Sequence, residues 1–223
     1  MNLLAVKTVK NAMKTIISNI AVLALATGLH ASEQAKEPMH AVKIVGIEAN
    51  LVKTPQFLAK GVPNKDLEAR QWLEIEAEVE VKTSDPSGYI PALQAEWFVM
   101  VKQEIEGQSK AFPFKLEGVS KYKDIRTKDG KIYLSAYIEP KTLERFFGDG
   151  RLRESDFKSL ALKLSGEGLM SGGRTAICTN EDFAKMLQGD WKFDYSDSGI
   201  VPKSKTPFAL INIDRYPTEE TGQ

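Results

Sequence analysis

Cysteine and histidine are almost absent from this chain of 223 residues. Cys178 is the only cysteine, so the chain has no intramolecular disulfide, and we interpret this residue as a small buried hydrophobic side chain. The two histidines are His30 and His40. Because histidine is the most common general base and metal ligand, we expect neither a histidine-based catalytic triad nor a zinc site.

An excess of positive charge is also missing. The chain holds 30 basic and 30 acidic residues, and three of the basic ones, Lys7, Lys10 and Lys14, lie in the first 31 residues, where there is no acid. The rest of the chain therefore carries 27 basic against 30 acidic residues, interleaved along its length. Nucleic-acid binders need clustered lysine and arginine to replace the counterions of phosphate, so we do not expect a nucleic-acid partner.

The common catalytic and cofactor motifs are absent too. Ser171 lies in GLMSGG, which is not the G-x-S-x-G of serine hydrolases. The glycines of GEGLMSGGR fit neither a phosphate-binding loop nor a dinucleotide fingerprint, and there is no EF-hand spacing. We therefore predict that the protein is not an enzyme and that it has no catalytic residues, no cofactor and no metal site.

The N-terminus has the pattern of an export signal. The only charged side chains in positions 1–14 are Lys7, Lys10 and Lys14. Positions 15–29, TIISNIAVLALATGL, are mostly apolar but shorter than the roughly 20 residues that span a bilayer. We predict a signal peptide at residues 1–31, cleaved after Ala31, and a mature protein in the periplasm or at the cell surface that does not span the membrane. The alternatives are an uncleaved anchor and a pilin-like helix, although no prepilin leader ending in glycine is present.

Residues 72–82 give the clearest structural signal in the mature part. In WLEIEAEVEVK, five apolar side chains alternate with Glu74, Glu76, Glu78 and Glu80, which predicts a strand with one face in a core and the other in water. Similar apolar patterns between turn signals predict further strands at residues 40–52, 93–105, 111–125, 131–139, 157–165 and 206–216.

Two short helices complete the prediction. Proline and glycine bound residues 140–148, and Asn180 offers an N-cap to an apolar helical face formed by Phe183, Met186 and Leu187. Because long helical crossovers are lacking, we predict a mainly β fold: an antiparallel Ig/fibronectin III-like β-sandwich with one or two short helices. It forms one domain, residues 32–216, after the signal peptide and before a disordered tail, residues 217–223.

Residues 94–99, QAEWFV, resemble strand C of Ig-like and fibronectin type III domains, in which a tryptophan packs across the core. This resemblance implies that Trp97 is buried between the two sheets. The cysteine pair of antibody domains is absent and no tyrosine corner can be placed, so the resemblance extends to the architecture.

Two surface features of the predicted sandwich are candidates for binding. The row of four glutamates lies at a spacing of about 6 to 7 Å, which suits a cation or a basic partner, or a solvated face paired with Lys102, Lys115 or Lys163 on neighbouring strands. The second feature is a candidate recognition patch of Trp191, Phe193 and Tyr195, whose rings either bind a ligand or cover one end of the core.

A leader followed by a single cysteine-poor sandwich resembles the pilus-associated Ig-like exported proteins of Akkermansia-type bacteria. The resemblance implies an accessory component of a type IV pilus-like or other cell-envelope assembly, with envelope or pilus-assembly proteins as partners and with self-association through β edges. The main alternative is a periplasmic small-ligand or glycan-binding protein that uses the aromatic patch. An enzyme would have to work with carboxylates alone.

Overall fold

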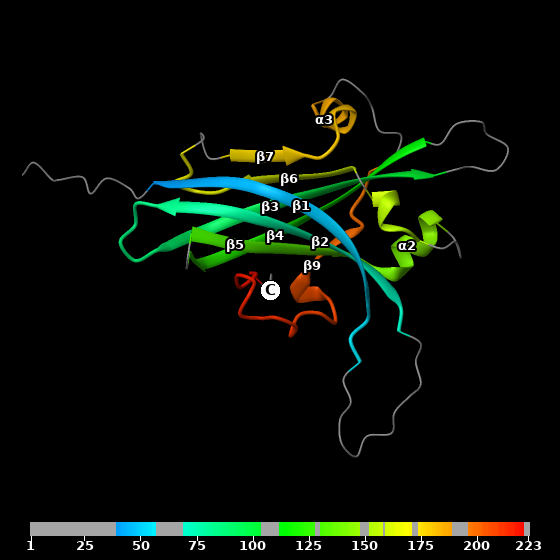
Figure 1. The fold of residues 1–223 in the computed structure, drawn as a ribbon, viewed down its shortest axis with the longest axis horizontal. Coiled ribbons are helices and arrows are strands. Elements are labelled where there is room, and N and C mark those ends of the chain that lie inside the picture. Colours follow the sequence, from blue (N-terminus) through cyan, green and yellow to red (C-terminus); the bar gives the residue numbers. More distant parts are fainter. Residues whose placement is uncertain are drawn as a thin grey trace, which may run out of the picture. The chain divides into compact units, whose positions relative to one another are not determined.

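Two β-sheets packed face to face form the fold, as the sequence predicted (Figure 1). The computed structural model describes residues 39–56, 69–103, 112–127, 130–147, 152–157, 159–170, 174–188 and 196–220. The predicted signal peptide therefore lies outside the described residues. No helix among the described residues is both long enough and apolar enough to cross a membrane.

The first sheet has four antiparallel strands in the order β1, β2, β5, β9. They are β1 (His40–Lys53), β2 (Gln71–Thr83), β5 (Lys131–Ile138) and β9 (Ile200–Pro202). The alternation predicted for β2 is confirmed, because its apolar residues from Leu73 to Val81 are at most 3% exposed while the four glutamates lie on the outer face. The first sheet therefore has an acidic outer face along its second strand.

The second sheet has five strands in the order β7, β6, β3, β4, β8. They are β7 (Arg174–Cys178), β6 (Ser159–Ser165), β3 (Tyr89–Gln103), β4 (Phe112–Arg126) and β8 (Ser196–Asp197). All pairs are antiparallel except the short parallel contact of β8 with β4. The sequence pattern did not predict β7, because its five residues, RTAIC, include a single large apolar side chain.

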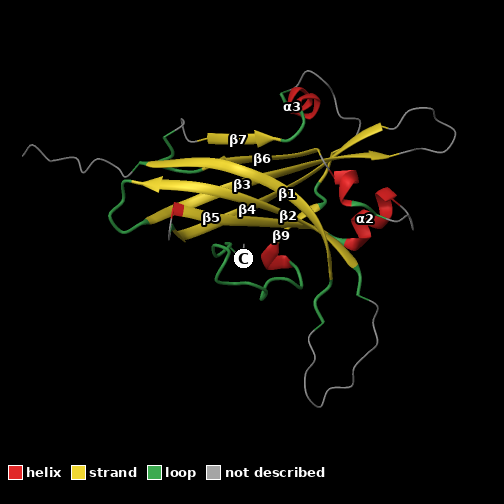
Figure 2. Cartoon of the chain, viewed as in Figure 1, coloured by secondary structure: helices red, strands yellow, loops and turns green. Residues whose placement is uncertain are grey.

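The core lies between the sheets. Trp97 of β3 is fully buried there, as the resemblance to strand C implied, beside Leu162 of β6 and opposite residues such as Leu134 of β5. At one end of the strands (Figure 2), helix α2 (Pro140–Phe147) closes the core with Leu143. Helix α2 and the 3₁₀ turn η2 (Glu154–Phe157) carry the chain from the first sheet to the second.

Helix α3 (Glu181–Leu187) covers part of the outer face of the five-stranded sheet. Its N-cap is Asn180, whose side-chain oxygen accepts a hydrogen bond from the Phe183 backbone N–H at 3.0 Å, as predicted. Phe183 and Met186 pack on outward-facing residues of β3 and β6 in a small second cluster with Phe98, Met100 and Ala161. The apolar helical face predicted from the sequence is thus the face that meets the sheet.

The strand predicted at residues 206–216 is wrong. After the 3₁₀ turn η3 (Lys203–Lys205), these residues form consecutive turns, in which Ala209 N–H bonds to the carbonyl of Thr206 at 3.1 Å. The Thr206 hydroxyl also donates to the Lys203 carbonyl and accepts from the Phe208 N–H, which stabilises a turn over a strand. Asn212 has a φ of 50°, a left-handed conformation that asparagine tolerates better than most residues.

The polar residues 217–220 do not fray. The backbone N–H of Glu220 bonds to the carbonyl of Lys121 at 2.7 Å, and the N–H of Lys123 bonds to the carbonyl of Thr218 at 3.3 Å. These residues therefore pair with the edge of β4, so the folded part of the chain extends past residue 216, the predicted end of the domain. Residues 221–223 lie outside the described residues.

Candidate functional site

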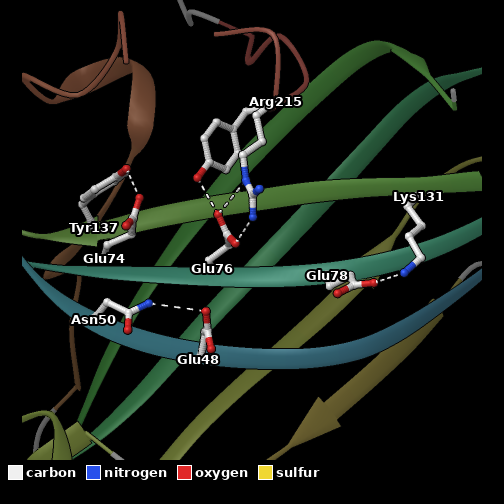
Figure 3. A network of polar contacts seen from close by, with 9 residues as sticks. Glu48, Asn50, Glu74, Glu76, Glu78, Lys131, Tyr137 and Arg215 are labelled. Carbon is white, nitrogen blue, oxygen red and sulfur yellow. Dashed lines mark hydrogen bonds and ion pairs between the residues drawn. The ribbon is translucent and has the colours of Figure 1, made fainter. Parts of the chain in front are cut away.

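The candidate recognition patch of Trp191, Phe193 and Tyr195 lies outside the described residues, so it stays a prediction. The structure describes the glutamate row completely, and the candidate site is built around it. All four carboxylates lie on the outer face of β2, and each one has its own neighbouring side chains. Figure 3 shows Glu74, Glu76 and Glu78 with theirs.

The two glutamates nearer the C-terminal end of β2 make ordinary surface ion pairs. Glu78 pairs with Lys131 of β5 at 2.5 Å, and Glu80 lies 4.0 Å from Lys43 of β1. These side chains are between 31% and 77% exposed, so each pair contributes at most about 1 kcal/mol. This half of the row is a solvated face, which is one of the two alternatives drawn from the sequence.

The lysines proposed as partners from the sequence are not the partners. Lys102, Lys115 and Lys163 belong to β3, β4 and β6, which are strands of the other sheet. Lys115 pairs with Glu117 at 2.7 Å, and the Lys163 ammonium lies 5.1 Å from the centre of the Phe98 ring. The prediction placed these lysines on strands next to β2, because the sequence does not show which strands belong to the same sheet.

The other half of the row is covered by the C-terminal segment, defined here as residues 203–220. Glu76 accepts hydrogen bonds from the Arg215 guanidinium at 2.5 and 3.3 Å and from the Tyr216 hydroxyl at 2.5 Å (Figure 3). The Glu76 side chain is only 15% exposed. The same guanidinium lies 3.9 Å from the centre of the Tyr133 ring, a cation–π contact that holds Arg215 flat on the sheet.

An aromatic cluster fixes the segment at its other end. The Phe208 ring stacks on Tyr137 of β5 at 4.8 Å and meets Trp72 of β2 edge-on at 5.7 Å. All three rings are at most 8% exposed. Burying this apolar surface against the outer face of the sheet stabilises the segment in this position.

Lys203 is a buried cation under the segment. Its side chain is 6% exposed, and its ammonium donates to the carbonyls of Ala209 and Ile211 at 3.2 and 2.6 Å. Burial lowers the pKa of Lys203, and the nearby carboxylates of Glu219 and Glu74 oppose that shift. Glu219 in turn accepts the backbone N–H groups of Lys203 and Ser204.

The tyrosines of the site are held in their neutral form. Burial, followed by the hydrogen bond to Glu74, raises the pKa of Tyr137. Burial, followed by the hydrogen bond to Glu76, raises the pKa of Tyr216. Both hydroxyls therefore act as hydrogen-bond donors to carboxylates over the whole physiological range of pH.

A cavity of about 330 Å³ lies between the segment and the sheet. It is lined by two carboxylates, two cationic side chains, three aromatic rings, three other side chains, and no histidine or cysteine: Val52, Glu74, Glu76, Tyr137, Lys203, Phe208, Ile211, Asn212, Arg215 and Tyr216. Within the described part of the chain, Glu74 forms no ion pair. The cavity can therefore offer one carboxylate and several rings to a small polar or cationic group.

The sequence did not reveal Lys203, Arg215 and Tyr216 as partners of the glutamate row. The sequence pattern placed Arg215 and Tyr216 in a predicted final strand, with nothing to relate it to β2, and predicted no element at Lys203. The prolines at 202, 207 and 217 are the signal that could have found the segment, because three prolines in sixteen residues favour a turning chain over a strand.

His40 and Cys178 each have a hydrogen-bond partner in the structure. His40 is buried at the start of β1, where its Nδ1 lies 2.7 Å from the Thr83 hydroxyl. The Cys178 thiol is partly buried and donates to the Asn180 carbonyl, and burial raises its pKa. Across the described ranges, no group of three or more His, Cys, Asp and Glu side chains is arranged to hold a metal ion.

Comparisons with known proteins agree with the fold. A crystal structure of a protein from Akkermansia muciniphila superimposes with a TM-score of 0.69 at 19% sequence identity, covering 84% of this chain and 96% of that one. A search of curated proteins found no match. A protein-family model matches residues 33–223, which is most of the chain. The chain therefore belongs to the matched family, in agreement with the resemblance of its sequence to the pilus-associated Ig-like proteins of Akkermansia-type bacteria.

Proposed function

We propose that this protein is a non-enzymatic, exported accessory component of a type IV pilus-like or other cell-envelope assembly, located in the periplasm or at the cell surface. The observation that carries the proposal is the family match over residues 33–223, which includes the whole sandwich. Its partners are envelope or pilus-assembly proteins. A sandwich suits this role because it offers strand edges and rigid faces to other proteins.

The non-enzymatic part of the proposal rests on the side chains of the site. The glutamates that a carboxylate-based enzyme would use are already bonded to Arg215, Tyr216, Tyr137 and Lys131. These bonds hold a segment on a sheet, and a substrate would have to replace them. We therefore assign the cluster a structural role.

Affinity capture from the protein's own host tests the proposed role. The tagged chain is expressed at its native level, cross-linked in intact cells, purified from detergent-solubilised envelopes and analysed by mass spectrometry. An exported protein of the same host with the same tag is the control bait. Enrichment of pilin, secretin or other pilus-assembly subunits over the control supports the proposal. A protein recovered without any such subunit contradicts it.

Small-ligand or glycan binding is a second candidate function, favoured by the 330 Å³ cavity beside Glu74. We expect a ligand there to raise the melting temperature of the wild-type chain, and Glu74→Gln to reduce the effect because the substitution removes the charge. Thermal shift measurements with panels of amines and sugars test this. A panel that shifts neither protein, or shifts both equally, removes the cavity as a ligand site.

A further inference from the structure

Strand β1 forms one edge of the four-stranded sheet, and β2 is the only strand hydrogen-bonded to it among the described residues, although β7 of the other sheet lies close to it. Backbone bonds to Gly168 and Met170 engage His40 alone, at the beginning of β1. From Ala41 to Lys53, then, the outward backbone groups have no backbone partner in the part of the chain that the structure describes. An edge of this length is a template for pairing with another strand.

The core is also less covered at this edge. Ile47, Ala49 and Leu51 pack against the core but remain partly exposed, whereas Leu73, Ile75 and Ala77, the residues opposite them on β2, are at most 1% exposed. A strand added beside β1 would cover these apolar side chains. Pairing at this edge would therefore bury apolar surface as well as form backbone hydrogen bonds.

A β-bulge in β1 restricts what can pair there. Ile44 is opposite Val79 and Gly46 is opposite Glu78, so Val45 is an extra residue. The core-facing positions are therefore His40, Val42 and Ile44 before the bulge, and Ile47, Ala49 and Leu51 after it. The pairing with β2 keeps both halves in phase only because it skips Val45. A regular strand that pairs residue for residue with the outer edge of β1 would match one half alone, because one extra residue exchanges the two faces of a strand.

A second copy of β1 does match both halves. In an antiparallel pair centred between Val45 and Gly46, Ile44 is opposite Ile47 of the other copy, and Val42 is opposite Ala49. Each pair joins two core-facing residues, because the two bulges meet at the two-fold axis. Sliding one strand by two residues in either direction gives the nearest alternative pairings. Each of them places a core-facing residue opposite an outer-facing one at the centre.

The charges are complementary in this same register. Lys43 and Glu48 are both exposed on the outer face, and each lies opposite the other across the axis, which gives two ion pairs per dimer. Val45, which is 43% exposed, lies beside the axis on the same face. Opposite charges facing each other across two strands are stabilising, and like charges are destabilising.

We propose that two copies of this chain associate through antiparallel pairing of β1 with β1, in the register that places Lys43 opposite Glu48. The pairing joins two four-stranded sheets into one continuous sheet. It goes beyond the proposed role in envelope assembly, which does not depend on it. The capture experiment and the association experiment below can thus fail independently.

Sedimentation velocity of the full chain over a range of concentrations tests the proposal with charge reversals. Lys43→Glu and Glu48→Lys each place two like-charged pairs across the axis, and we expect each to weaken self-association about tenfold or more. A one-to-one mixture of the two variants restores both ion pairs, as does the double variant Lys43→Glu/Glu48→Lys, so both regain wild-type association. Lys123→Glu, an exposed charge reversal on β4, is the matched control and leaves association unchanged.

The outcomes separate clearly. Recovery of association in the mixture and in the double variant supports the register, because no general effect of charge predicts it. A wild-type chain that stays monomeric at every concentration overturns the proposal. Association that is equal in the single variants, the mixture and the control also overturns it, since the contact then lies elsewhere. Thermal unfolding of each variant verifies that the fold is retained.

Discussion

Replacing Glu76 with alanine should release the C-terminal segment without unfolding the sandwich. The substitution removes the two hydrogen bonds from Arg215 and the one from Tyr216. A hydrogen bond to a charged group contributes about 1.5 to 3 kcal/mol, and we reduce the total to about 2 kcal/mol because the Arg215 side chain is 44% exposed and already partly solvated. That is about a 30-fold increase in the population of the open segment.

Limited trypsin digestion measures this opening. The segment contains Lys203, Lys205 and Arg215, and cleavage follows the population of the open form when opening is fast relative to cleavage. We expect cleavage after these residues to be about 30-fold faster in Glu76→Ala, as read by mass spectrometry of the fragments. The sandwich itself should unfold in urea with nearly the same slope as the wild type, because its core is unchanged.

Glu78→Ala is the matched control for this experiment. It removes a neighbouring carboxylate on the same face of β2, but the partner is Lys131 of β5 and not a residue of the segment. We expect a loss of at most about 1 kcal/mol of stability and unchanged cleavage in the segment. Equal acceleration of cleavage in both variants, or no acceleration in Glu76→Ala, would refute the reasoning, because the Glu76 bonds would then not hold the segment.

Three further predictions concern other parts of the fold. Gly118→Ala should cost about 1 to 3 kcal/mol in urea unfolding, because a Cβ there overlaps the carbonyl oxygen of Ile200 and lies 2.7 Å from its Cβ, whereas Gly46→Ala, with open space around it, should stay within about 0.5 kcal/mol. Because the pKa of Tyr216 is raised above its unfolded value of about 10, its contribution is present below pH 10 and lost as the pH rises further, so Tyr216→Phe should make the alkaline fall in stability shallower by up to about 1.4 kcal/mol per pH unit. An equally steep fall in both proteins would count against this assignment. Finally, Cys178 should react with a disulfide reagent at pH 8 more slowly in the folded chain than in urea, since burial raises its pKa, and equal rates would contradict its partial burial.

The parts of this fold that were predicted correctly are those that local sequence determines. The alternation in β2 fixes which face is buried, because successive side chains on a strand point to opposite sides. The N-cap at Asn180 and the proline at 140 mark helix starts through contacts within a few residues. The tryptophan of β3 is large and apolar and lies on the apolar face of its strand, so its complete burial also follows from the pattern.

The parts that were missed depend on contacts between distant residues. Arg215 lies 139 positions from Glu76, and nothing in either local pattern relates them. The apolar residues of the segment, such as Phe208 and Leu210, also fit a strand, and only packing decides that Phe208 stacks on the sheet while Leu210 is 76% exposed. The prediction of the lysine partners of the glutamates was wrong for the same reason, because strand order is a property of the tertiary fold.

Among the described residues, no segment of the chain pairs with the outer edge of β1 beyond His40. Helix α3 covers part of one outer face, and the C-terminal segment covers part of the other. On β4, the edge of the second sheet is engaged by β8 and by residues 217–220. The outermost strands of the two described sheets are β1 and β9 in the first and β7 and β8 in the second. Of these, β1 is the longest, with an exposed lysine and an exposed glutamate placed symmetrically about its bulge. A partner strand must accept that bulge and those charges, and the same strand of a second copy meets both conditions without any change in the fold.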